Sequence, residues 1–103
     1  MKAVNQQQWE QGIETYPNAV ILDVRTDAEW QEGRLPGAQQ LDISKVDAFK
    51  NAVAEMDRDQ HYFIYCRSGM RSANACQYME QLGFLNTYNL EGGITAWRGP
   101  VEK

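Results

Sequence analysis

The sequence predicts an α/β protein with a central parallel sheet of about five strands flanked by helices. Short apolar runs alternate along the chain with segments of helical periodicity, which is typical of βαβ units. Residues 19–22 are uniformly apolar, as expected for a parallel strand that is buried on both faces. A chain of 103 residues can bury one hydrophobic core but not two. We therefore expect a single domain over residues 1–103, with right-handed crossovers.

The amino-terminal part is expected to form a short strand over residues 2–4 and a helix over residues 6–15. Asn5 is a suitable N-cap, because its side chain can accept a hydrogen bond from a free N–H group of the first turn. Trp9 and Ile13 lie one helical turn apart, so we expect both to face the core.

Pro17 ends this helix and precedes the buried strand over residues 19–22. Thr26 can cap a short helix that Gly33 ends. A third strand is expected over residues 38–43.

Asp23 and Arg25 lie at the carboxyl end of the strand over residues 19–22. Ligands in open α/β sheets bind beyond the carboxyl ends of the strands, so both side chains could approach a site. A strand-end Asp that caps a turn and pairs with a neighbouring Arg is the interpretation that we favour.

In the middle of the chain, Ser44 or Asp47 can cap a helix that extends to about residue 56. Val46, Phe49 and Val53 recur on one face of this helix and are expected to pack on the core.

After a polar loop, the pattern predicts a strand over residues 61–65 and a helix over residues 71–82 with Gly83 as its C-cap. A last strand over residues 85–90 precedes a helical turn over residues 94–97.

Residues 66–72, with the sequence CRSGMRS, lie between the strand over residues 61–65 and the next helix. A cysteine thiolate is the nucleophilic form, and its pKa falls at a helix N-terminus or beside an arginine. Cys66 has both neighbours, and the backbone N–H groups of the loop can surround an anion. The predicted substrate-binding residues are Arg67, Ser68, Gly69, Met70 and Arg71. The alternative is a buried cysteine that acts as a small hydrophobe, but two arginines and a Ser-Gly pair favour the anion-binding loop.

Cys76 has a different expected role, because it recurs with Ala75 and Met79 on the inner face of a helix. Its position inside the helix does not suit a disulfide with Cys66. One histidine and two cysteines also lack the clustered spacing that zinc requires. We expect no metal and no cofactor.

The overall charge and hydropathy exclude two classes of partner. A net charge of −4 without a basic patch argues against nucleic-acid binding. The apolar stretches are far shorter than the roughly 20 residues that span a bilayer. The first residues carry no apolar signal segment, so a cytoplasmic location is expected.

Four motifs lie in the order and spacing of a known family: residues 20–25 (VILDVR), 32–38 (EGRLPGA), 66–72 (CRSGMRS) and 90–94 (LEGGI) followed by Ala96-Trp97. Over nearly the whole chain the sequence resembles the rhodanese homology domain, here as a single-domain sulfurtransferase. The resemblance implies that a cysteine takes a sulfane sulfur from a donor such as thiosulfate and holds it as a persulfide. It then passes the sulfur to cyanide, a thiol or another thiophilic acceptor, and a partner protein's cysteine could take part.

Carried over to this chain, the resemblance makes Cys66 the nucleophile and persulfide carrier, with residues 67–71 as the cradle that Arg71 closes. The chain departs from the family at Arg34, where many members have histidine. We place Arg34 at the rim of the pocket, where its charge leaves the choice of substrate open.

Two other function classes fit parts of this sequence. A phosphatase related to this fold spaces its residues as Cys-x5-Arg, whereas four residues separate Cys66 from Arg71. The shorter loop should fit one added sulfur better than a tetrahedral phosphate. A non-catalytic or persulfide-relay binding module is the second alternative, although the cysteine is present. His61 lies about 16 Å before Cys66 at about 3.3 Å per strand residue, so a Cys-His hydrolase is not expected.

Overall fold

A computed structural model describes residues 1–103 and contains one five-stranded sheet with the strand order β1-β5-β4-β2-β3. All four strand pairs are parallel. The predicted fold class is therefore confirmed. No helix has the length and apolarity needed to cross a bilayer. The elements are β1 (Lys2–Val4), α1 (Gln6–Thr15), β2 (Val20–Asp23), α2 (Asp27–Glu32), β3 (Ala38–Gln40), α3 (Val46–Ala54), β4 (His61–Tyr65), α4 (Met70–Gln81), β5 (Asn86–Leu90) and η1 (Ile94–Ala96).

Two predicted helix starts are confirmed in detail. The Asn5 side chain accepts a hydrogen bond from the backbone N–H of Gln8, whose own side chain accepts one from the Asn5 backbone. Thr26 and Glu29 form the same reciprocal arrangement at the start of α2. Both are capping boxes, which satisfy two of the free N–H groups at a helix start.

The predicted cap of α3 is wrong. The N-cap residue is Lys45, whose side chain makes no capping hydrogen bond. Ser44 is engaged instead by Asp42, whose carboxylate accepts hydrogen bonds from the Ser44 backbone and hydroxyl. Asp47 lies inside the first turn, and Val46 is 53% exposed rather than packed on the core. The local turn at Asp42 competes with capping for the same hydroxyl.

Several other boundaries differ from the prediction by one to three residues. β3 ends at Gln40 instead of residue 43. The backbone after it still donates hydrogen bonds to the carbonyls of Asp23 and Val24, but no longer in the regular register of the ladder. α4 begins at Met70, one residue early, with Leu82 as its C-cap. Gly83 follows that cap with φ of 93°, a conformation that favours glycine.

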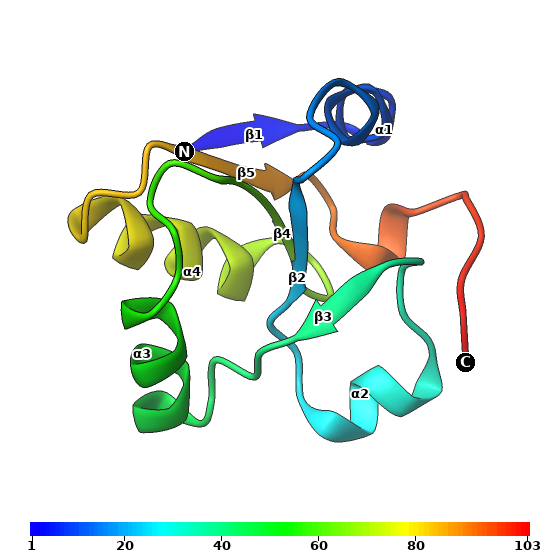
Figure 1. The fold of residues 1–103 in the computed structure, drawn as a ribbon. Coiled ribbons are helices and arrows are strands. Elements are labelled where there is room, and N and C mark those ends of the chain that lie inside the picture. The colour runs from blue at the N-terminus through cyan, green and yellow to red at the C-terminus, as the bar shows by residue number, and fades with distance from the viewer.

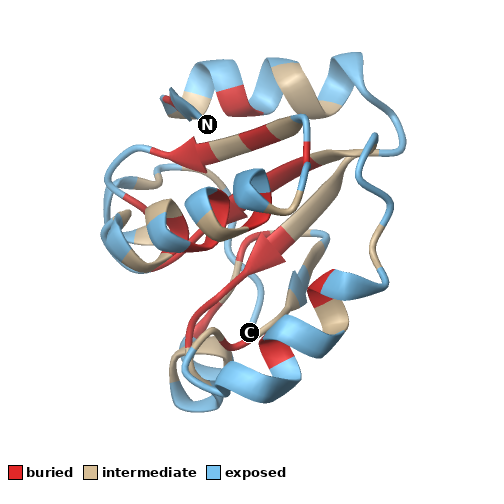
Figure 2. Cartoon of the chain, turned by 90° about the vertical axis from the view of Figure 1, so that its left-hand side faces the viewer, coloured by how far each residue is buried: buried red, intermediate tan, exposed pale blue.

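Alternate residues of β4 face two separate cores on the two sides of the sheet. Tyr62 and Ile64 pack with α3 and α4, and Cys66 continues on that side. Phe63 and Tyr65 pack on the other side, where α1 contributes Trp9. Figure 1 shows α3 and α4 on one side of the sheet and α1 on the other, and Figure 2 shows buried positions concentrated in the strands between them.

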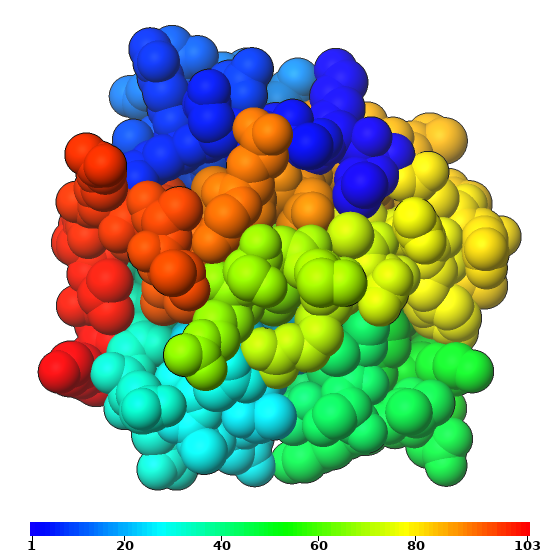
Figure 3. Space-filling view, turned by 180° about the vertical axis from the view of Figure 1, so that it is seen from behind, coloured from blue at the N-terminus to red at the C-terminus, as the bar shows by residue number.

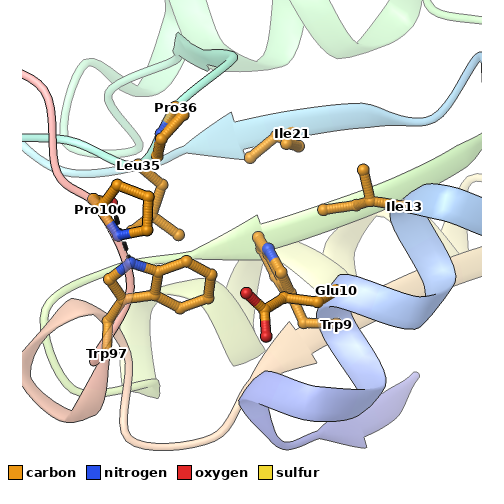
Figure 4. A pocket seen from close by; sticks show the side chains of 8 residues that line it. All are labelled: Trp9, Glu10, Ile13, Ile21, Leu35, Pro36, Trp97 and Pro100. Atoms are coloured by element: carbon orange, nitrogen blue, oxygen red, sulfur yellow. Dashed lines mark hydrogen bonds between the residues drawn. The ribbon is translucent and has the colours of Figure 1, made fainter.

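The direction of the chain connections switches between the carboxyl ends of β2 and β4. The chain leaves β2 toward β3 on one side and leaves β4 toward β5 on the other side. Open α/β sheets bind ligands at such a switch of direction. Cys66 follows β4 directly, so the loop that it begins lies at this switch of direction. The pocket in Figure 4 lies on the α1 side of the sheet, where Trp9, Leu35 and Trp97 line it, and contains no residue of this loop.

Candidate active site

The side chain of Cys66 lies at the floor of the loop between β4 and α4, and the residue is 1% exposed. Its Sγ accepts a hydrogen bond of 3.0 Å from the backbone N–H of Gly69, the N-cap residue of α4. Because free N–H groups and the positive end of the helix dipole meet at this terminus, negative charge on the sulfur is stabilised.

The turn after β5 holds the loop backbone in place. Ile94 and Thr95 donate backbone hydrogen bonds of 3.0 and 3.1 Å to the carbonyl oxygens of Cys66 and Arg67. The contact requires Gly93, because a Cβ there would lie 2.4 Å from the Arg67 oxygen and the residue has φ of 58°. The turn thus binds the carbonyls of the loop and leaves its N–H groups free for the sulfur.

Ser72 provides a hydroxyl at the sulfur from the first turn of α4. Its Oγ lies 3.3 Å from Cys66 Sγ and 2.5 Å from Asn89 Oδ1. Asn89 is oriented by its Nδ2, which donates to the carbonyl of Gly69. A hydroxyl carries one hydrogen, so Ser72 can donate to the thiolate or to Asn89 but not to both.

The balance of burial and hydrogen bonding sets the acidity of the thiol. Burial raises the pKa of Cys66, whereas hydrogen bonds from the Ser72 side chain and from the backbone of Ser72, Gly69 and Ser68 lower it. The lowering prevails, and the pKa lies below that of an ordinary cysteine. The leading causes of this lowering of the pKa are hydrogen bonds. The sequence-based prediction assigned more of it to the charges of Arg67 and Arg71.

Replacing Ser72 with alanine is expected to slow alkylation of Cys66 at neutral pH by about ten-fold, because one hydrogen bond to a charged group is lost. The variant should show its alkylation midpoint at higher pH. Rates of iodoacetamide modification against pH measure this. Ser68→Ala is the control. It also removes a hydroxyl from the loop, but Ser68 lowers the pKa of Cys66 through its backbone N–H, which the variant keeps. Equal midpoints for the two variants would contradict a role for the Ser72 hydroxyl.

The two arginines of the loop lie in different surroundings. Arg67 is exposed. Arg71 forms a bidentate ion pair with Glu29 of α2, with N···O distances of 2.8 and 2.9 Å. Met70, between Gly69 and Arg71, is 76% exposed. In Figure 3 the yellow-green loop and first turn of α4 lie between the orange segment after β5 and the cyan atoms of α2.

Arg34, predicted at the pocket rim, makes its contacts away from the cysteine loop. Its guanidinium lies 4.7 Å from the Trp30 ring centroid and donates to the Trp30 carbonyl. Its backbone pairs with Glu102 through hydrogen bonds of 2.9 and 2.8 Å. The carboxyl-terminal segment is thereby held beside the end of α2.

Asp23 and Arg25 form a buried cluster instead of contacting Cys66. The Asp23 carboxylate accepts hydrogen bonds from the Arg25 side chain and from the Tyr65 hydroxyl at 2.6 Å. Arg25 also donates to the Gly33 carbonyl, and the Tyr65 hydroxyl accepts from the Leu35 N–H. The structural interpretation of this pair is supported, because the cluster ties the segment after α2 to the central strand.

The comparisons with known proteins agree with this geometry. A family model for the rhodanese-like domain matches residues 5–100. The chain is 40% identical to a sulfurtransferase of Allochromatium vinosum, over 78% of this chain and 72% of the relative. It is 35% identical to the thiosulfate sulfurtransferase GlpE of Pseudoalteromonas translucida, over 78% of this chain and 73% of the relative. The crystal structure of a rhodanese-like domain protein from Staphylococcus aureus superposes with a TM-score of 0.84 at 29% identity, covering 99% of this chain and 97% of that chain.

This chain belongs to the rhodanese-like domain family.

Three residues at the site of this rhodanese-like domain were not among the predicted site residues: Ser72, Asn89 and Glu29. Ser72 could have been found, because it shares a helical face with Ala75 and Cys76, and a serine on a buried face needs a polar partner. From sequence, Glu29 is recognisable only as the capping-box partner of Thr26, the N-cap residue of α2. No local pattern indicates that Asn89 or Glu29 approaches the loop.

Cys76 and His61 lie apart from the site of the rhodanese-like domain. Cys76 is fully buried among apolar side chains, and burial raises the pKa of its thiol to about 12. Both cysteines are free. His61 stacks on Tyr16 at 3.6 Å and bonds to the Tyr88 hydroxyl at the opposite end of β4 from Cys66.

Proposed function

We propose that the chain is a sulfurtransferase that carries a sulfane sulfur as a persulfide on Cys66. The donor is a small sulfur compound such as thiosulfate or a low-molecular-weight persulfide, and the acceptor is cyanide or a thiol, including a cysteine of a partner protein. The observation that carries the proposal is the buried sulfur held by the Gly69 N–H and the Ser72 hydroxyl. The family and the relatives named as sulfurtransferases support it.

The first step needs a thiolate but no general base. The Cys66 thiolate attacks the outer sulfur of thiosulfate, an S–S bond forms at Sγ, and the donor's S–S bond breaks to release sulfite with its electron pair. The negative charge then lies on the outer sulfur of the persulfide. In the second step cyanide attacks that outer sulfur, and thiocyanate leaves while the Cys66 thiolate is restored. Loop N–H groups stabilise the charge in each state.

Loop length favours this reaction over phosphate hydrolysis. The hydrogen-bond donors of the loop lie at the sulfur itself, with Gly69 N at 3.0 Å from Sγ. An in-line phosphoryl group would need its oxygens surrounded beyond the sulfur, which a longer Cys-x5-Arg loop allows. We therefore expect no turnover of aryl phosphates.

The proposal is tested by intact mass spectrometry after incubation with a panel of sulfur donors. The protein should gain the mass of one sulfur atom, and cyanide or a reducing thiol should remove it, because persulfidation is reversible. Peptide mapping should place the added sulfur on Cys66 and leave Cys76 unmodified. Hydrolysis of aryl phosphates through Cys66, with no sulfur gained from any donor, would overturn the proposal.

A further inference from the structure

The ion pair between Glu29 and Arg71 joins α2, which follows β2, to α4, which follows β4. Both carboxylate oxygens accept from the guanidinium, at 2.8 and 2.9 Å. Glu29 is also fixed from its other side, because it accepts hydrogen bonds from the backbone and hydroxyl of Thr26. The Arg71 guanidinium holds the pKa of the Glu29 carboxyl at about 2, so the carboxylate is charged at any working pH.

Arg71 lies in the first turn of α4, between two residues that contact the Cys66 sulfur, Gly69 and Ser72. It precedes Ser72, whose Oγ is 3.3 Å from Cys66 Sγ. The pKa of Arg71 is raised first by its hydrogen bond to Glu29 and also by the charge of Cys66. Arg71 thus belongs to the loop that begins at the reacting sulfur, while its guanidinium is held by the Glu29 carboxylate.

The two donor classes place different demands on this cation. Thiosulfate is a dianion, and its leaving group, sulfite, carries two charges away from Cys66. A persulfide R–S–SH of an uncharged thiol loses only a thiolate R–S⁻ when Cys66 attacks its outer sulfur; the proton stays on the transferred sulfur. Thiosulfate, a dianion, must compete with Glu29 for the positive charge of Arg71. A persulfide releases a singly charged thiolate, so its reaction depends less on electrostatic stabilisation by Arg71.

We propose that Glu29 is a specificity-determining residue that disfavours thiosulfate relative to persulfides of uncharged thiols by occupying Arg71. The inference rests on the proposed sulfur transfer and narrows its donor class. Met70, the residue before Arg71, is 76% exposed, so it can offer an apolar contact to a donor that approaches the start of α4. The organic group of a persulfide can use such a contact, whereas a hydrated dianion cannot.

The test compares Glu29→Gln with Glu32→Gln in loading experiments with two donors. Glutamine keeps the capping interaction with Thr26, since capping boxes accept either side chain. Glu32 is exposed on the same helix and makes no ion pair, so its variant changes the net charge equally. Rate constants for sulfur loading are measured with thiosulfate and with the persulfide of 2-mercaptoethanol. The ratio of the two rate constants does not depend on the fraction of active protein.

Glu29→Gln should raise the thiosulfate-to-persulfide ratio about ten-fold, and Glu32→Gln less than about two-fold. In an Arg71→Gln background, Glu29→Gln should produce no such rise, because the effect acts through Arg71. An unchanged ratio in Glu29→Gln, an equal rise in Glu32→Gln, or a rise that persists without Arg71 would each overturn the inference. If the wild-type protein loads sulfur and the variants give one of these contradicting results, only the role of Glu29 is refuted. Wild-type protein that loads from neither donor refutes the proposed function itself.

Discussion

Replacing Cys66 with serine is expected to abolish sulfur loading, while Cys76→Ser keeps it. A serine hydroxyl stays protonated at neutral pH and cannot form the persulfide, so no variant molecule should gain a sulfur atom. Intact mass after incubation with a donor, followed by cyanide-dependent release of thiocyanate, measures the loss. Circular dichroism should show that the Cys66 variant is folded.

The Cys76 variant is the matched control, because it makes the same change in the second turn of α4. Cys76 is 0% exposed in a core whose one polar partner for it is the Thr87 side chain, so the more polar hydroxyl should lower the free energy of unfolding by about 1–2 kcal/mol. Urea unfolding measures this cost. Equal loss of loading in the two folded variants would show that Cys66 has no special role.

Replacing Asp23 with alanine is expected to lower the free energy of unfolding by about 3–5 kcal/mol, because a buried arginine loses its partner. Arg25 is 4% exposed, and its guanidinium would retain only the Gly33 carbonyl. The Tyr65 hydroxyl would lose the carboxylate to which it donates. Domains of this size are stable by only about 5–15 kcal/mol, so the variant should unfold at much lower urea concentration.

Lys45→Ala is the control for this prediction, because it removes an ion pair with Asp27 in which both side chains are more than half exposed. Exposed ion pairs contribute little to stability, so its urea midpoint should stay close to that of the wild type. Tyr65→Phe should fall between the two, since it removes the hydroxyl's hydrogen bonds with Asp23 and with the Leu35 N–H but leaves the ion pair. An Asp23→Ala protein as stable as Lys45→Ala would contradict the role assigned to the buried cluster.

Helix starts show which local features sequence reasoning can determine. The caps at Asn5 and Thr26 were predicted correctly because each capping box lies within four consecutive residues. The cap of α3 was not, because the Ser44 hydroxyl bonds to Asp42 instead of the helix. A serine hydroxyl can cap a helix or bond to a nearby carboxylate, and the path of the chain after β3 decides which of the two Ser44 does.

The sequence by itself determined the parallel α/β architecture, the strand-loop-helix context of Cys66 and the inner position of Cys76, because hydrophobic periodicity and capping act within one element. Only the tertiary structure decided which side chains meet at the sulfur. The order of the strands places the loop after β2 beside the loop after β4, so that Glu29 pairs with Arg71 across 42 residues of sequence. Pairing of β4 with β5 likewise brings Asn89 to Ser72. Strand order is set by packing of the whole sheet against its helices, and no local pattern encodes it.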